Sequence, residues 1–163
     1  EEYNETRNKL GRLLDDHLAE LGCIVPQLVP QGSKRVYAYH YNRYVPEKLG
    51  GLSTASFLKA LAAEGVVCGV CGYGLLHQAP LFNGENPFGL GTYASNQPLP
   101  NTENLAANAF MAAPRFETAT ESDVMEYVAA YRKVVENAEQ LLADEKDKDV
   151  RIEAESGRSI NLV

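Results

Sequence analysis

Cys68 and Cys71 form a C-x-x-C pair, and this spacing could support thiol–disulfide chemistry. In thioredoxin-like proteins the first thiolate of such a pair is stabilised at the N-terminus of a helix that follows a strand. Here the pair is followed by Gly72, Tyr73 and Gly74, which form a poor helix-forming sequence. A thiol redox module is therefore one alternative function. The competing interpretation is that Cys68 is a small core residue and Cys71 lines a loop.

A structural zinc site would need about four ligands at close spacing. The other residues that could bind the ion are scattered along the chain: Cys23, His17, His40 and His77. There is neither a second C-x-x-C nor an H-x-x-x-H. The sequence therefore predicts no metal site.

A glycine-rich stretch follows the first cysteine and leads to His77. Its order, G-x-x-G-x-G, is not the dinucleotide-binding fingerprint, and no helix opens directly after it. A bend that lets the backbone approach a neighbour closely is the better interpretation. His77 has no nearby serine or cysteine that would make a nucleophile, and a lone histidine is more often a structural hydrogen-bonding group.

Helices and strands that alternate along the chain must position these residues. Apolar residues at helical spacing predict helices over residues 2–21, 53–64, 101–108 and 120–142. Strands are expected over residues 36–44, 66–68 and 109–113. This order predicts an α+β fold, with helices packed on one face of a small, mostly antiparallel sheet.

One surface of the expected fold is a candidate for binding a ligand or a partner. Polar side chains on both faces of the strand over residues 36–44 suggest that one face meets a pocket or an interface. The bend at residues 69–80 follows in the chain, and then a polar loop reaches to about residue 100. A loop of that length in a compact domain is usually functional or is covered by a partner.

The composition of the 163 residues is that of one globular domain, with 45% hydrophobic and 23% charged residues. The net charge of −7 disfavours both a nucleic-acid partner and an anionic membrane surface. No apolar run approaches the roughly 20 residues of a membrane span, and the charged opening of the chain is unlike a signal peptide. Three cysteines do not suggest a disulfide scaffold, so a cytoplasmic protein is expected.

Several segments in order resemble one known family: VYAYHYNRY, VPEKLGGLS, FLKALAAEGV and GYGLLHQAPLF, followed later by FMAAP and TESDVMEYVAAYRKV. The pattern resembles the C-terminal domain of the DegT/DnrJ/EryC1/StrS family of pyridoxal-phosphate (PLP)-dependent aminotransferases, which act on keto-sugars and keto-cyclitols. It looks most like the branch with glutamine:scyllo-inosose aminotransferases. The resemblance covers residues 2–142.

The resemblance implies the small C-terminal domain of a fold type I PLP enzyme over residues 1–142, followed by a charged spacer and an unplaced tail over residues 143–163. PLP would be held mainly by a large domain that precedes this region, in a homodimeric enzyme with glutamine or glutamate as amino donor. None of the lysines stands in the Ser- and Gly-rich context that the family uses for its PLP lysine. We therefore expect no catalytic residue in this chain, and no activity from it alone.

By the same resemblance, Gly72, Tyr73, Gly74 and His77 would lie near the substrate cleft and bind the keto-sugar or keto-cyclitol. No cofactor-binding residue is assigned. A non-catalytic binding or assembly domain stays open as a further alternative. In that case the apolar seams of the first and last helices would dock a partner.

Overall fold

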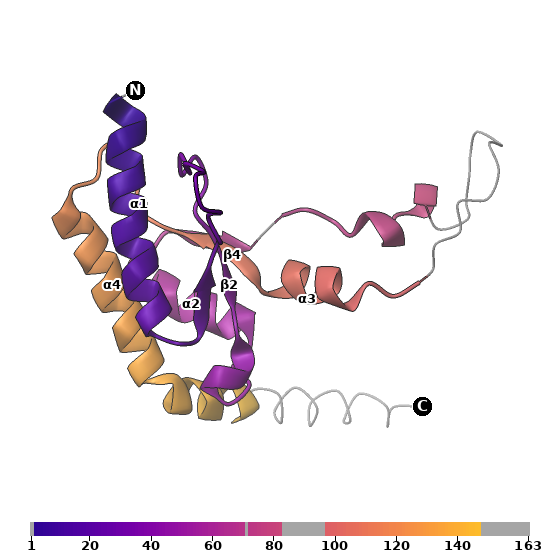
Figure 1. The fold of residues 1–163 in the computed structure, drawn as a ribbon. Coiled ribbons are helices and arrows are strands. Elements are labelled where there is room, and N and C mark those ends of the chain that lie inside the picture. The colour runs from indigo at the N-terminus through magenta and orange to yellow at the C-terminus, as the bar shows by residue number, and fades with distance from the viewer. Residues whose placement is uncertain (1, 71, 83–96, 148–163) are drawn as a thin grey trace, which may run out of the picture.

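The computed structural model describes residues 2–70, 72–82 and 97–147 (Figure 1). The helices are α1 (Glu2–Glu20), α2 (Thr54–Ala63), α3 (Pro100–Asn108) and α4 (Glu121–Glu136), with 3-10 turns at Pro46–Leu49, Leu76–Gln78 and Pro80–Phe82. The strands are β1 (Ile24–Pro26), β2 (Tyr41–Tyr44), β3 (Cys68–Val70) and β4 (Ala109–Ala112). After a turn at Asn137 the chain is helical again over residues 138–147.

The strands form one antiparallel sheet in the order β1-β2-β4-β3. Helices α1 and α4 lie side by side, and together with α2 they bury one face of this sheet (Figure 1). On the other face, which we call the open face, Val25 and Arg43 are exposed. The expected α+β fold, with helices on one face of an antiparallel sheet, is confirmed.

Aromatic rings fill the centre of the core between the sheet and the helices. The ring of Tyr44 stacks on that of Phe57 with their centroids 4.3 Å apart, and Phe110 and Tyr131 pack around this pair. The two buried phenol groups keep a hydrogen-bond partner, since Tyr44 Oη donates to the Leu52 carbonyl at 3.0 Å and Tyr131 Oη to that of Ala112 at 3.0 Å.

The helices begin where the sequence predicts. The Ser53 side chain accepts from the Ser56 amide at the start of α2, and Thr120 and Asp123 form a complete capping box at the start of α4. Helix α4 buries Val124, Val128, Tyr131 and Val134, whereas Val135 is only half-buried. The helix also ends at Glu136 instead of running on to residue 142.

The strand expected over residues 36–44 begins only at Tyr41. The segment before it is irregular, and Tyr37 takes a left-handed backbone conformation with φ of 49°. This conformation places the Tyr37 ring, 4% exposed, against Gly11 of α1, where an added Cβ would come within 2.3 Å of the ring. The expected alternation of side chains fails here because tertiary packing outweighs the β-propensity of the segment.

The charged spacer expected from residue 143 is helical as far as residue 147. The Glu145 carboxylate accepts hydrogen bonds from Ser56 Oγ at 2.6 Å and from the Ser53 amide at 3.2 Å, at the N-terminus of α2. A carboxylate is favourable there because the helix dipole is positive at that end. Residues 148–163 lie outside the described residues, and the domain division at residue 142 stays a prediction.

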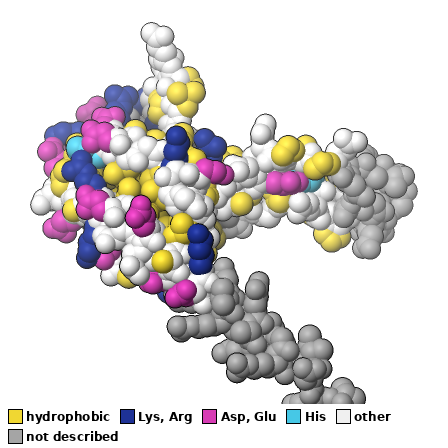
Figure 2. Space-filling view, turned by 90° about the horizontal axis from the view of Figure 1, so that it is seen from below, with side chains coloured by type: hydrophobic (Ala, Val, Ile, Leu, Met, Phe, Trp, Pro, Cys, Tyr) yellow, Lys and Arg dark blue, Asp and Glu magenta, His cyan; other side chains and the backbone are white. Residues whose placement is uncertain are grey.

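Between β3 and β4 the chain extends away from the body, with α3 on its returning limb (Figure 1). We call its described segments, residues 72–82 and 97–108, the arm. Figure 2 shows hydrophobic side chains on the surface of this projection, and those of Tyr73 and Leu76 are 78% and 72% exposed. Among the described residues no helix is long and apolar enough to cross a membrane.

Candidate functional site

The four residues expected to bind substrate all lie on the outgoing limb of the arm. An added Cβ at Gly72 or Gly74 would meet no atom within 4 Å. The close backbone approach expected at this bend is therefore not made to any described part of the chain. The two glycines and the exposed ring of Tyr73 therefore lie open with respect to the described residues.

His77 connects the two limbs of the arm. Its Nε2 lies 2.9 Å from Glu103 Oε1 of α3, and the same oxygen accepts from the Leu99 amide at 3.1 Å. The hydrogen bond with His77, and then that with Leu99, lowers the pKa of the Glu103 carboxyl. This contact gives His77 a structural role, and its assignment to substrate binding stays a prediction.

A groove of about 670 Å³ lies between the open face of the sheet and the arm. Its walls come from β1, β2 and both limbs of the arm, and include Val25, Tyr41, Arg43, Tyr73, Leu76 and Leu105. Of the four predicted site residues, Tyr73 and Gly74 line this groove, whereas Gly72 and His77 do not. The groove is mainly apolar, and Arg43 is the one charged side chain among the described residues that line it.

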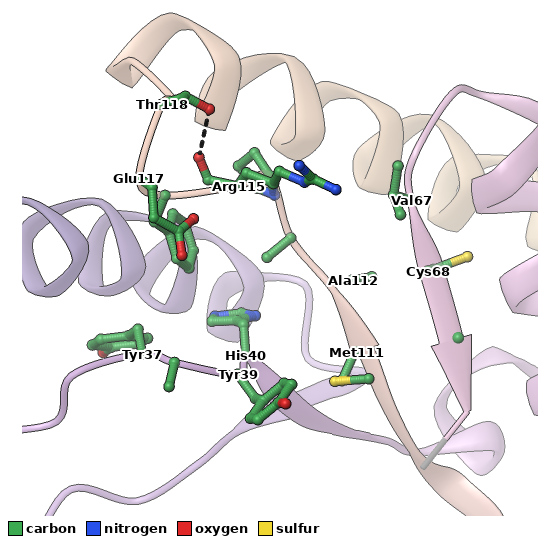
Figure 3. Close-up of a pocket in the computed structure, with 15 residues that line it drawn as sticks. Tyr37, Tyr39, His40, Val67, Cys68, Met111, Ala112, Arg115, Glu117 and Thr118 are labelled. Carbon is green, nitrogen blue, oxygen red and sulfur yellow. Dashed lines mark hydrogen bonds between the residues drawn. The ribbon is translucent and has the colours of Figure 1, made fainter. Parts of the chain in front are cut away.

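A second cavity, of about 620 Å³, lies where the chain leaves β4 (Figure 3). Tyr37, Tyr39 and His40 lie on one side of it and Val67 on the other. Tyr37, Tyr39 and His40 belong to the segment over residues 36–44, one face of which was expected to meet a pocket or an interface. Val67 was not a candidate, and a role for His40 was considered only as a scattered metal ligand.

Beside this cavity a polar network is centred on Asp15 of α1. Its carboxylate lies 2.7 Å from His40 Nε2, accepts from the Tyr37 hydroxyl at 2.7 Å, and accepts from Arg35 at 3.3 Å. On the far side of the imidazole, Asn42 Nδ2 lies 2.9 Å from His40 Nδ1. A neutral ring that donates from Nε2 and accepts at Nδ1 satisfies both contacts.

The network fixes the irregular segment before β2 and offers no reactive group. His40 is 4% exposed and has both ring nitrogens engaged, so neither is available to a substrate. Burial, together with the hydrogen bond to Asp15, raises the pKa of Tyr37, which therefore stays a neutral donor. The sequence signal was the presence of polar residues in a segment rich in β-branched and aromatic residues, but nothing in the sequence pairs them with Asp15.

Cys68 is half-buried and packs against the core. Its Sγ donates to the Leu58 carbonyl at 3.3 Å, and Figure 3 shows the sulfur directed away from Tyr39 and Met111. Burial raises the pKa of this thiol, which is the opposite of what a redox-active thiolate needs. Cys71 lies outside the described residues, so the geometry of the expected pair is untested.

The described ranges contain no group of three or more His, Cys, Asp or Glu side chains placed to hold a metal ion. The described lysines, at positions 9, 34, 48, 59, 133 and 146, are all exposed. Two of them form ion pairs, Lys9 with Glu121 and Lys133 with Glu64. No described lysine lines the groove.

No protein-family model matches the chain, and a search of curated proteins finds no match. A search of solved structures does find similar folds. The crystal structure of 3-amino-5-hydroxybenzoic acid (AHBA) synthase superposes with a TM-score of 0.61 over 83% of this chain, at 15% sequence identity. The superposition covers 35% of that protein, so this chain spans about a third of its length. At such low identity the likeness establishes a shared fold: the helices and sheet described above have the architecture of one portion of AHBA synthase.

Proposed function

We propose that this chain is the small C-terminal domain of a PLP-dependent aminotransferase of the DegT/DnrJ/EryC1/StrS family. The observation that carries the proposal is the fold likeness to AHBA synthase, a PLP-dependent aminotransferase of that family, over 83% of the chain. The sequence segments between residues 36 and 134 support it independently, because they resemble the same family. In the whole enzyme an amino group would pass from glutamine or glutamate to a keto-sugar or keto-cyclitol, in the cytoplasm.

The described residues do not fit PLP itself. When bound, the cofactor supplies an electron sink, and it needs a lysine and a partner for its ring nitrogen in an enclosed site. The described lysines are exposed on the surface instead. We therefore derive no step on PLP from this chain, and we assign the cofactor to a large domain of the whole enzyme, which we propose to be a homodimer.

The contribution of this domain would be to position the substrate. The groove and the bend at Gly74 face away from the helix-covered side of the sheet, and the hydroxyl of Tyr73 is free to reach a ligand oxygen there. A small number of polar groups in a mostly apolar pocket is the usual way to fix a ligand's orientation. The network around Asp15 would hold the segment before β2 rigid behind this surface.

The test uses the full gene product that contains this chain. We expect bound PLP with absorbance at about 410–430 nm, borohydride trapping on one lysine outside residues 1–163, and glutamine-dependent amination of a keto-cyclitol or keto-sugar. The chain of residues 1–163 alone should trap no stoichiometric PLP. A gene product that binds no PLP would refute the proposal, and so would PLP trapped on a single lysine of this chain.

A binding or assembly role is the second candidate. The apolar seams of α1 and α4, which were expected to dock a partner, are buried in the core, and the arm is the observation that favours this role instead. Three of its apolar side chains are more than half exposed: Tyr73, Leu76 and Leu105. Exposed apolar groups that cluster on one projection are typical of a surface that meets a partner. Gel filtration of the gene product that lacks PLP, with and without its copurifying proteins, would test this role.

A further inference from the structure

Arg43 occupies an unusual position on the open face of the sheet. It lies in β2, one of the two inner strands of the sheet, with Val25 of β1 and Ala109 of β4 as its register neighbours on either side. Its side chain forms no hydrogen bond or ion pair with any described residue. An unpaired arginine is ordinary at a solvated surface, but this one stands between two apolar neighbours in the wall of a groove.

The charge of the groove is opposite to that of the chain. The chain carries 22 acidic residues against 15 basic ones. Nevertheless, the described lining of the groove includes no aspartate or glutamate, and Arg43 gives it a single positive charge. A guanidinium without a carboxylate of its own favours an anion from outside.

The rest of the groove favours a ligand whose anionic group is attached to an apolar part. Leu28 is 87% exposed, Leu76 72% and Leu105 51%, and all three line the groove beside the exposed ring of Tyr73. A ligand that covered these side chains would remove apolar surface from water, which is favourable in proportion to the area. The volume of about 670 Å³ is in the range of small-molecule sites.

From this geometry we infer that the groove binds a small organic carboxylate, with the carboxylate on Arg43 and an apolar or aromatic body against the arm. One guanidinium matches one carboxylate, because its two parallel N–H groups meet the two oxygens. A phosphate carries close to two negative charges at neutral pH, and the single positive charge of Arg43 would balance only part of them. The hydroxyls of Tyr73 and Thr102 offer hydrogen bonds to a polar substituent on the body.

The inference goes beyond the proposed function, since the binding requires neither PLP nor transamination. A carboxylate on an apolar body differs from the keto-sugar or keto-cyclitol expected from the sequence resemblance. The two ligand classes can therefore be compared directly.

The test is a set of calorimetric titrations of the full chain with three probes. Phenylacetate carries both the charge and the body, acetate the charge alone, and 2-phenylethanol the body alone. We expect saturable binding of phenylacetate, with acetate and 2-phenylethanol each weaker by roughly tenfold or more, because each lacks one of the two interactions. A cyclitol, myo-inositol, serves as the polyol probe and should not compete.

Three variants separate the role of Arg43 from a general charge effect. Arg43→Gln should weaken phenylacetate by roughly tenfold or more, to the level of 2-phenylethanol, and Arg43→Lys should retain part of the binding. Arg115→Gln, in the wall of the other cavity, is the matched control and should leave binding unchanged. Melting curves of all three variants check that each protein is folded.

Several outcomes would overturn the inference: no saturable binding of phenylacetate to the unaltered protein, equal affinity for 2-phenylethanol, or unchanged affinity in a folded Arg43→Gln variant. These results are independent of the test of the proposed function. A protein without PLP can still bind phenylacetate through Arg43, and an active aminotransferase can still fail to do so.

Discussion

The body of the protein and its arm are stabilised in different ways. In the body, α4 begins with a complete capping box and buries Val124, Val128 and Tyr131 against the sheet and α1. On the arm, α3 begins after Leu99 without a side-chain cap and has no buried residue. The body is therefore stable through its own core, whereas the arm depends on a few polar contacts and on whatever surface it meets.

This difference fits two separate roles, with the body providing stability and the arm providing a binding surface. A ligand-binding surface needs side chains that are not already satisfied within the fold, and segments of low local stability commonly supply them. The groove combines the two regions, because one wall is the rigid sheet with Arg43 and the other is the arm with Tyr73 and Leu76. Substitutions in the body should change the free energy of unfolding, and substitutions on the arm should change binding.

The largest expected difference in the free energy of unfolding is between truncating a buried ring in the body and truncating a leucine on the arm. Phe57→Ala removes a fully buried ring that stacks on Tyr44, and it should lower the free energy of unfolding by about 3–5 kcal/mol. Leu105→Ala, at a half-exposed position of α3, should change it by less than about 0.5 kcal/mol. Urea denaturation measures both, and a cost above about 2 kcal/mol for Leu105→Ala would mean that the arm belongs to the cooperative core.

The next effect concerns the network on Asp15, which lies in the body although it borders a cavity. Asp15→Asn retains the shape of the side chain but removes the charge that accepts from Tyr37, His40 and Arg35. We expect a loss of about 2–3 kcal/mol in the free energy of unfolding, as for hydrogen bonds to a charged group.

Asp16→Asn, at the exposed neighbouring position of α1, is the matched control and should be nearly neutral. Equal stability of the two variants in thermal melts would show that the network contributes nothing to the body. A loss confined to Asp15→Asn would instead confirm that the segment before β2 is held by this carboxylate.

The sequence predicted the body better than the arm, and the reason is physical. Helix periodicity and caps are local signals, so the helix starts at Ser53 and Thr120 were predicted correctly. The expected strand over residues 36–44 was too long because Tyr37 packs on Gly11, and no local pattern records a contact between residues 26 positions apart. The contact of Glu145 with α2 was missed for the same reason.

The candidate site was predicted in part. The glycine-rich bend indicated Tyr73 and Gly74, which do line the groove. Arg43 lies within the strand expected over residues 36–44, but it was not singled out, because its importance depends on having apolar neighbours from β1 and β4, which only the sheet register reveals. His77 was noticed as a lone histidine, and its partner Glu103 lies 26 residues later, beyond the long loop.

A smaller effect compares the helix starts of the two regions. Thr120→Ala removes the capping side chain of α4 and should lower the free energy of unfolding by about 1 kcal/mol. Leu99→Ser supplies a capping side chain to α3, which lacks one, and should increase the protection of its amides from hydrogen exchange without raising the melting temperature. A higher melting temperature for Leu99→Ser would contradict the separation of arm and body.

The smallest effect is on the acid side of the pH scale, where each region has a carboxyl group with a lowered pKa. The hydrogen bond with His77 lowers the pKa of Glu103 on the arm, and hydrogen bonds from the Thr120 amide and hydroxyl lower that of Asp123 in the body. In both cases the folded pKa lies below the unfolded value of about 4, so each contribution is present above pH 4 and is lost as the pH falls through the folded pKa.

The two losses should differ in extent. Protonation of Glu103 weakens only the contacts of its carboxylate with His77, Leu99 and Gln78, so below about pH 4 the chemical shifts of the α3 amides should change while the body stays folded. Glu103→Gln should remove that change, because it leaves no carboxyl group to titrate, whereas Asp123→Asn should leave it intact and alter only the start of α4. In the Glu103→Gln variant, acid should change the amide chemical shifts of α4 but not those of α3. Changes of equal size in both helices would mean that the two limbs of the arm are joined by something other than the His77–Glu103 pair. The separation of arm and body would then rest on the truncation experiment alone.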